Sequence, residues 1–341
     1  MDHSIKKSKN STGQTFIWAL IILCLVITFI FAVVIGPVNI PFSDVVKAIF
    51  HHSTNVDSTI ILSLRLPRAI AGVIVGGALG ISGVIFQGIL RNPLADPYIL
   101  GISAGAALGA TIAQTLLFTY VPVSISAFIG AMCAMLLVYG LSRSSGSSMP
   151  LYLVLAGFAI SALLGSIMAF VIMVSNSLQI KIYSIMLWLM GGLRETTWHE
   201  LMFISVVFAV LVFLAVGITD KLDILALGDE KALSLGMHVE STRIGAMAIG
   251  AILTGIAVYL SGLVGFVGLV IPHITRLLIG PSHKRLIIMS FLIGAVFLLL
   301  SDLIARIILK PVDVPVGIIT SLIGAPFFLF LVLKAKKGYR F

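Results

Sequence analysis

Charge is the scarcest feature of this sequence of 341 residues. Asp, Glu, Lys and Arg make up only 10% of it, hydrophobic residues make up 59%, and the mean hydropathy is +1.17. Soluble globular domains carry about 25% charged residues, so the composition excludes that class. A β-barrel is also disfavoured, because barrel strands alternate polar and apolar residues whereas this chain has long continuous apolar runs. The sequence therefore predicts an all-α integral membrane protein.

Cysteines and catalytic groupings are scarce too. Cys24 and Cys133 both lie in apolar runs, which excludes a disulfide framework or metal cluster and predicts two small buried hydrophobic residues. His273 has no second His, Cys or acid at ligand spacing, which favours a hydrogen-bonded histidine at a helix start over a metal ligand. The sequence contains no nucleophile with a base, no paired carboxylates and no Walker A motif. We therefore predict that the chain is not an enzyme, has no ATPase site, and binds no metal or cofactor.

Acidic residues number 13 against 22 basic ones, which gives a formal net charge of +9. The basic residues are scattered at the ends of apolar runs and form no continuous basic face, so nucleic acid is not an expected partner. The tendency of cytoplasmic loops to carry Lys and Arg explains their placement more simply.

The apolar runs predict about ten membrane-spanning helices in one transmembrane domain covering residues 1–341. The expected spans are residues 16–35, 60–90, 99–118, 122–141, 151–174, 199–218, 243–261, 266–280, 286–308 and 316–333. The motif RNPLADP should break the chain after the second span, because both prolines disfavour helix in the residue before them. A partly inserted helix is expected around residues 182–189 at the outer surface.

An even number of spans places both chain ends on one side of the membrane. The basic segments 1–15 and 334–341 are predicted cytoplasmic tails, and residues 220–241 a cytoplasmic loop. In this orientation the inside segments hold 15 Lys and Arg residues and the outside segments 7. That excess supports a multi-pass membrane protein with both ends on the cytoplasmic side.

Two glycine-rich segments resemble each other, GGALGISGVIFQ in the second span and SGLVGFVGLVIPH in a later one. Because they begin on opposite sides of the membrane, they suggest an inverted repeat, which is common in transporters. Close helix packing through small residues gives the same spacing, so both readings stay open. The similarity of Gly262, Gly265 and Gly268 to a nucleotide-binding motif is discounted, because no strand precedes a helix there.

Residues 220–240 form the one interior segment that is dense in charge. Its seven charged residues are Asp220, Lys221, Asp223, Asp229, Glu230, Lys231 and Glu240. Such a segment cannot lie in lipid and must face water. Gly228 and Gly236 bracket the run DEKALSL, which predicts a short helix that begins with acids and ends at a glycine. A solvated connector is the alternative reading.

Arginines mark the outer ends of two spans. Arg65 and Arg68 are three residues apart on one helix face, where interfacial anchoring is an alternative to a binding role. Asp302 and Arg306 are four residues apart and are expected to form a salt bridge within one helix. Arg306 lies one turn closer to the surface and is expected to be free to reach outward.

Several motifs then occur together in a fixed order. They are RLPR (65–68), GGALGISGVIFQGILRNPLADPYILGISAGA (76–106), LGDEKALSLG (227–236), GLVGFVGLVIPHITR (262–276), SDLIAR (301–306) and PVGIITSLIGAPFF (315–328). The combination resembles the permease subunits of the iron-siderophore, haem and cobalamin ABC importers, which are type II importers of the FecCD kind. The resemblance covers nearly all of the chain after the first span.

The resemblance implies that the chain pairs with an identical or homologous permease, two ATP-binding-cassette ATPases and an extracytoplasmic substrate-binding protein. ATP and Mg²⁺ would be bound by the partner ATPases. It implies that Arg65, Arg68 and Arg306 face acidic residues of the binding protein. It also implies ATPase coupling through Gly228, Asp229, Glu230, Lys231, Ala232, Leu233, Ser234, Leu235 and Gly236.

The expected activity is import of a ferric siderophore by alternating access, with haem or cobalamin as alternative cargo. A cytoplasmic gate near Ser147 and Ser148 is predicted from loop position. An ion-coupled secondary transporter is the alternative from another class, and it is disfavoured because Asp302 is the only acid well inside a late span. Where related permeases often carry Glu-Leu-Pro before the last span, this chain has Asp313, Val314 and Pro315.

Overall fold

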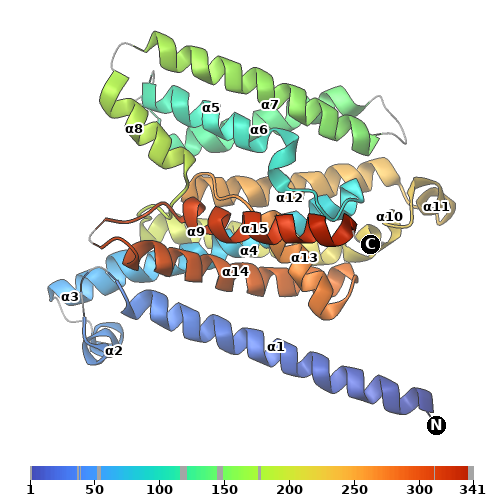
Figure 1. Cartoon of the computed structure of the whole chain (residues 1–341), viewed down its shortest axis with the longest axis horizontal. Coiled ribbons are helices and arrows are strands. Elements are labelled where there is room, and N and C mark those ends of the chain that lie inside the picture. Colours follow the sequence, from blue (N-terminus) through green and yellow to red (C-terminus); the bar gives the residue numbers. More distant parts are fainter. Residues whose placement is uncertain are drawn as a thin grey trace.

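The computed structural model describes residues 2–36, 38, 40–51, 55–115, 121–143, 149–175, 178–310 and 312–336 (Figure 1). Every regular element in these ranges is a helix, which confirms the all-α prediction. Predicted gate residues Ser147 and Ser148 lie outside the described residues, as does the C-terminal segment 337–341.

Eight helices in the described part of the chain are long and apolar enough to cross a membrane. They are α1 (Asp2–Val34), the continuous helix formed by α3 (Val56–Thr59), η1 (Ile60–Arg65) and α4 (Leu66–Leu90), then α6 (Val123–Ser142), α7 (Met149–Val174), α9 (Trp198–Gly217), α12 (Val239–Ser261), α14 (His283–Ile307) and α15 (Val316–Lys336). Each coincides with a span expected from the sequence. The basic N-terminal segment continues α1 as helix.

The two other expected spans contain shorter helices, α5 (Ile102–Thr115) and α13 (Val267–Ile279). At 1.5 Å per residue, α13 is about 20 Å long, less than the hydrocarbon thickness of about 30 Å. It begins directly after Phe266, whose positive φ of 67° is incompatible with extending the helix toward earlier residues. Apolar composition predicted both of these segments. It did not predict the irregular backbone that precedes each helix, at Gly101 before α5 and at Phe266 before α13.

The remaining short helices lie between the long ones in sequence. They are α2 (Phe42–His51), η2 (Pro97–Leu100), α8 (Leu178–Leu189), α10 (Thr219–Leu225) and α11 (Asp229–Ser234). In Figure 1, α10 and α11 share the right-hand end with the start of α1 and the end of α15, whereas α2 and α3 lie at the opposite end. The charged segment and both chain ends therefore lie on one side, as an even number of spans requires.

Helix α4 is the centre of the packing and contacts α9, α12, α13 and α14. A Cβ added at Gly76 would lie 2.2 Å from the carbonyl oxygen of Gly294 on α14, and one at Gly83 would lie 2.0 Å from that of Gly268 on α13. The two glycine-rich segments are thus in direct backbone contact. Glycine is required there because any side chain would separate the helices.

Outward-facing helix surfaces are apolar. Phe158 on α7 and Phe213 on α9 are almost fully exposed, as expected for faces that contact lipid or another subunit. Cys133 on α6 lies on such a surface, and Cys24 is half-buried. The expectation that both cysteines are buried is therefore wrong for Cys133, because an apolar run in a membrane span does not tell its inner face from its outer one.

We expect Gly76→Ala to destabilise the protein by about 1–3 kcal/mol, because the new methyl group forces α4 and α14 apart. Thermal unfolding in detergent measures the loss. Gly245→Ala is the matched control, since nothing lies within 4 Å of a Cβ at that position on α12. Equal unfolding temperatures for both variants would contradict the role of the contact.

Candidate functional site

Arg65 and Arg306 lie together at the end of the bundle opposite α11, where they cap α1. Arg65 donates from Nη1 to the carbonyl oxygens of Val33 (3.2 Å) and Val34 (2.5 Å). Arg306 donates to those of Ile35 and Ala32, both at 3.0 Å. The last carbonyls of a helix lack intrahelical partners and carry partial negative charge, which is why cations stabilise them.

This capping contradicts the orientation expected for the Arg306 side chain. Its side chain is only 4% exposed, and the expectation that it is free to reach outward is wrong. The guanidinium is turned inward because α1 ends beside it, and this contact between distant segments leaves no local signal in the sequence. The predicted salt bridge is confirmed, with Arg306 Nε 3.0 Å from Asp302 Oδ2.

Arg68 is the most exposed of the three arginines, with 24% of its side chain accessible. Its Nε and Nη2 donate to Asp302 Oδ1 at 3.0 and 2.9 Å, and its Nη1 donates to Asp313 Oδ2 at 3.0 Å. Asp302 is 1% exposed and is shared by Arg68 and Arg306. The structure thus brings all three predicted arginines to one end, where two carboxylates partly neutralise them.

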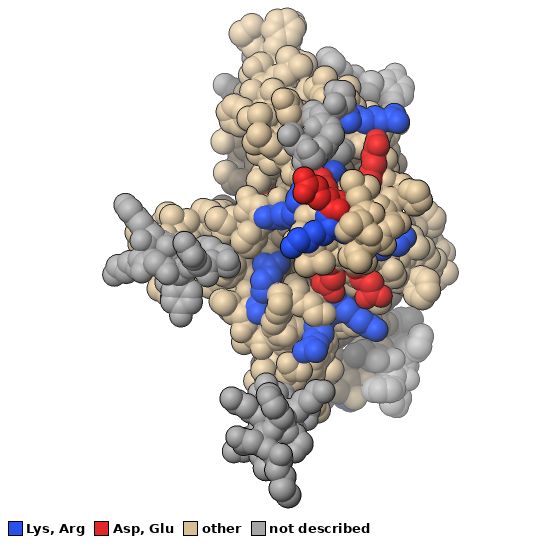
Figure 2. All heavy atoms as spheres, turned by 90° about the vertical axis from the view of Figure 1, so that its right-hand side faces the viewer, with Lys and Arg blue, Asp and Glu red and all other residues tan. Residues whose placement is uncertain are grey.

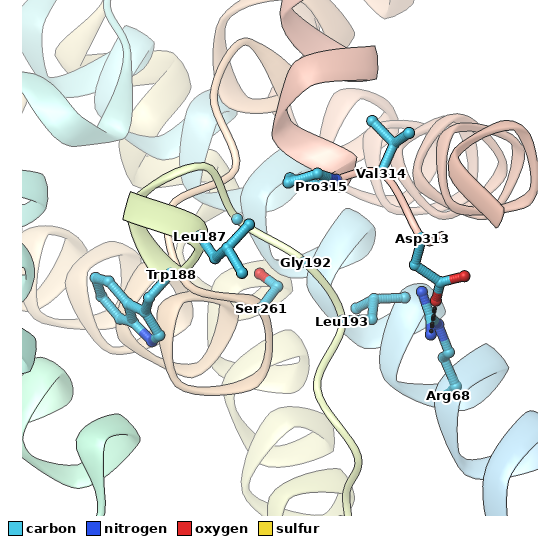
Figure 3. A pocket seen from close by; sticks show the side chains of 10 residues that line it. Arg68, Leu187, Trp188, Gly192, Leu193, Ser261, Asp313, Val314 and Pro315 are labelled. Atoms are coloured by element: carbon cyan, nitrogen blue, oxygen red, sulfur yellow. Dashed lines mark hydrogen bonds and ion pairs between the residues drawn. The ribbon is translucent and has the colours of Figure 1, made fainter. Parts of the chain in front are cut away.

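A hollow of about 210 Å³ opens beside this cluster (Figure 3). Arg68 and Asp313 point toward each other on one side of it, and Trp188 and Leu187 of α8 lie on the other. A second hollow, of about 540 Å³, is lined by Tyr98, Leu189, Met190, Leu263, Gly265, Gly317, Ile318, Ser321 and Leu322. Its lining comes mostly from apolar side chains and glycine.

Three non-helical segments meet at these hollows, residues 190–197, 262–266 and 312–315. The segment 190–197 bonds to the neighbouring helix ends: Gly192 N–H donates to Ser261 O at the end of α12 at 2.8 Å, and Gly317 N–H at the start of α15 donates to Gly191 O at 3.3 Å. Irregular backbone at membrane depth is tolerated only where it is buried in protein or lines a cavity. All three segments contribute residues to the lining of the two hollows.

The opposite end of the bundle carries the charged segment. As the sequence predicts, α11 lies between two glycines, Gly228 with φ 106° and Gly236 with φ 78°. Leu233 is 60% exposed and Leu235 is 63% exposed, and Leu227 before the helix is also exposed. Because this segment lies outside the candidate spans, lipid does not account for these leucines. Exposed apolar side chains on a water-facing segment indicate a protein partner.

Charged residues of both signs are interspersed over this end (Figure 2). Asp229, the first residue of α11, is only 10% exposed and contacts two arginines of its own chain. Glu230, the next residue, is exposed. Within the predicted coupling set, therefore, Glu230, Leu233 and Leu235 face outward whereas Asp229 and Ala232 face inward.

Metal ligation finds no support in the described residues, where no group of three or more His, Cys, Asp or Glu residues could hold an ion. His273 is buried in the middle of α13, in edge contact with Phe327 at 6.4 Å between ring centroids. The expectation that it starts a helix is wrong, because α13 begins at Val267 and contains Pro272.

Comparison with known proteins assigns the architecture. The FecCD transport family matches residues 24–334. The chain belongs to this FecCD transport family. It is 39% identical over 282 residues to the hemin transport system permease protein of Yersinia pestis, covering 81% of this chain and 84% of the relative. It is 36% identical over 342 residues to the Fe(3+)-citrate import system permease protein of Bacillus subtilis, covering 98% and 99%.

A solved structure also resembles this FecCD chain. It is an inward-facing conformation of a metal-chelate type ABC transporter, with a TM-score of 0.82, 32% sequence identity, and coverage of 94% of this chain and 99% of the other. The chain is therefore an ABC importer permease, a multi-pass membrane subunit that works with ATPase and substrate-binding partners.

In the FecCD chain, we expect Asp302→Asn to cost about 3–5 kcal/mol of stability, because it leaves Arg68 and Arg306 adjacent without their shared carboxylate. Thermal unfolding of the purified permease measures it. The control is Asp44→Asn, which breaks an exposed pair with Lys47 at 3.1 Å and should cost less than about 1 kcal/mol. Similar losses for both variants would show that the cluster is not a buried network.

Proposed function

We propose that this permease moves a ferric siderophore into the cytoplasm by alternating access, driven by ATP hydrolysis in two partner ATPases. The observation that carries the proposal is the meeting of two non-helical segments, residues 190–197 and 262–266, at a hollow of about 540 Å³ in an otherwise helical membrane bundle. Transporters place their substrate paths where spans are interrupted, because unpaired backbone groups and small residues can then face the cargo.

The cargo class is proposed from the named relatives. They include Fe(3+)-citrate and iron(3+)-hydroxamate import permeases of Bacillus subtilis and an iron chelatin permease of Helicobacter pylori. Haem and cobalamin remain the alternative cargoes, since a hemin permease and a cobalamin permease are similarly related. An ion-coupled mechanism has less support, because Asp302 is already paired with Arg68 and Arg306.

The assembly we propose has a second permease, identical or homologous, which completes the path against the open side of the 540 Å³ hollow. The end that carries α11 is cytoplasmic by the excess of Lys and Arg on that side. ATP and Mg²⁺ are bound by the ATPases, not by this chain. The ATPase docks on α11 through Leu233 and Leu235, and a binding protein docks at the opposite end through Arg68, which Asp302 and Asp313 hold in place beside the capping arginines Arg65 and Arg306.

We expect Leu233→Asp with Leu235→Asp to release the ATPase, because two carboxylates replace the apolar contact surface of α11. Co-purification of the ATPase with the permease measures this. The matched control is Leu309→Asp, a leucine 63% exposed at the opposite end. Retention of the ATPase by the double variant would contradict docking on α11.

Cargo is tested with the permease, its ATPase and its binding protein in proteoliposomes. We expect uptake of a radiolabelled ferric hydroxamate siderophore and none of haem or cobalamin at equal concentration. Uptake of haem or cobalamin alone would overturn the siderophore assignment and leave the importer assignment intact.

The same assay tests docking at the outer end. Arg68→Glu should abolish uptake that depends on the binding protein, because an acidic side chain then meets acidic residues of the partner. Lys310→Glu, a charge reversal of an exposed residue after α14, is the control and should retain uptake. Normal uptake by Arg68→Glu would exclude a docking role for this residue.

A further inference from the structure

Two aspartates in the segment that carries the proposed ATPase contact turn back toward their own chain. Asp229 begins α11, and Asp223 lies in α10. Their acidic neighbours Asp220 and Glu230 are exposed and make no ion pair among the described residues. Asp229 is 10% exposed and Asp223 is 43% exposed, and both differ from these neighbours in contacting other helices of their own chain.

Asp229 joins α11 to two long helices. Both of its oxygens accept from Arg243 Nη2 of α12, at 2.9 and 3.1 Å. Its Oδ1 also accepts from Arg91 Nη2 at 3.0 Å. Arg91 is the residue that ends α4, with a left-handed φ of 50°, and Arg243 is 3% exposed. A buried carboxylate shared by two guanidiniums fixes the start of α11 against the ends of α4 and α12.

Asp223 joins α10 to a third helix. Its Oδ1 accepts the backbone N–H of His283 at 3.2 Å and lies 2.5 Å from His283 Nδ1. His283 is the first residue of α14, and Ser282 before it makes no capping hydrogen bond with its side chain. Asp223 therefore supplies from another segment the cap that this helix lacks. The His283 ring sits over Gly88 of α4, where a Cβ would lie 2.9 Å from Nε2.

The helices reached in this way are the packed centre of the protein. Helices α4 and α14 are in backbone contact at Gly76 and Gly294, so a displacement of their ends is carried along both helices together. From these contacts we infer that Asp229 and Asp223 are positioning residues, which transmit movement of the α10–α11 segment to α4, α12 and α14. The inference rests on the proposed ATPase docking at α11, but assigns these aspartates to transmission and not to docking.

Asp229→Asn and Glu230→Gln distinguish transmission of movement from docking of the ATPase. The two residues are adjacent, and only Asp229 is turned toward its own chain. Each variant is assembled with its ATPase and binding protein in proteoliposomes, and cargo uptake and ATP hydrolysis are measured together. We expect Asp229→Asn to retain the ATPase while cargo moved per ATP hydrolysed falls at least about fivefold. Glu230→Gln should keep the wild-type ratio. An unchanged ratio in Asp229→Asn would overturn the inference.

Loss of the ATPase from the Asp229→Asn complex would also overturn it, since Asp229 would then be a docking residue, and docking on α11 would stand. Failure of the wild-type chain to bind the ATPase through Leu233 and Leu235 would instead refute the proposed function.

If Asp229→Asn does not fold, Arg91→Gln removes the more exposed of the two arginine partners of Asp229 and keeps the buried pair between Asp229 and Arg243. The same fall in the ratio supports the inference, and a wild-type ratio overturns it.

A second measurement distinguishes transmission of movement through Asp229 from a non-specific destabilisation of the permease. Asp229→Asn and Arg243→Gln are compared singly and together for the ratio of uptake to hydrolysis. If the two residues act through each other, the double variant is no worse than the more severe single variant. Multiplication of the two single effects would mean independent actions, which overturns the inference.

Discussion

The close approach of helix backbones at α4 is the contact on which the rest of the structure depends. Lipid provides no hydrophobic drive between helices, so they associate by packing, and packing is tightest where glycine removes the side chain. Gly76 against Gly294 and Gly83 against Gly268 fix α14 and α13 on α4. That arrangement sets Asp302 beside Arg68 at one end of the bundle and His283 beside Gly88 at the other.

The few charges of this chain act largely as links between segments. At one end of the bundle, two arginines cap α1 and a buried aspartate joins α4 to α14. At the opposite end, Asp229 joins α11 to α4 and α12. A buried charge is tolerated only when it is paired and hydrogen-bonded, so each such group holds two elements in one relative position. These links make the two ends of the permease suited to pass movement through the bundle.

Much of the fold was predictable because a membrane constrains the sequence strongly. Each apolar run contains a helix, and the prolines of RNPLADP follow the end of α4 at Leu90. The break between η2 and α5 at Gly101 and the left-handed backbone at Phe266 were not predictable, since hydropathy reports whether a segment suits lipid and not whether its backbone is helical. The contacts of Arg306 and His273 were missed because their partners are distant in the chain.

The sequence by itself determined the class of protein, the family, the order of the apolar helices and the helix between Gly228 and Gly236, since these follow from local composition and from motifs in order. Only the tertiary structure decided which residues of the two sites face outward. Asp229 and Glu230 are adjacent and chemically alike, yet one is bound by Arg91 and Arg243 and the other is exposed. Pairing over such distances is set by how the helices pack, and local sequence does not encode it.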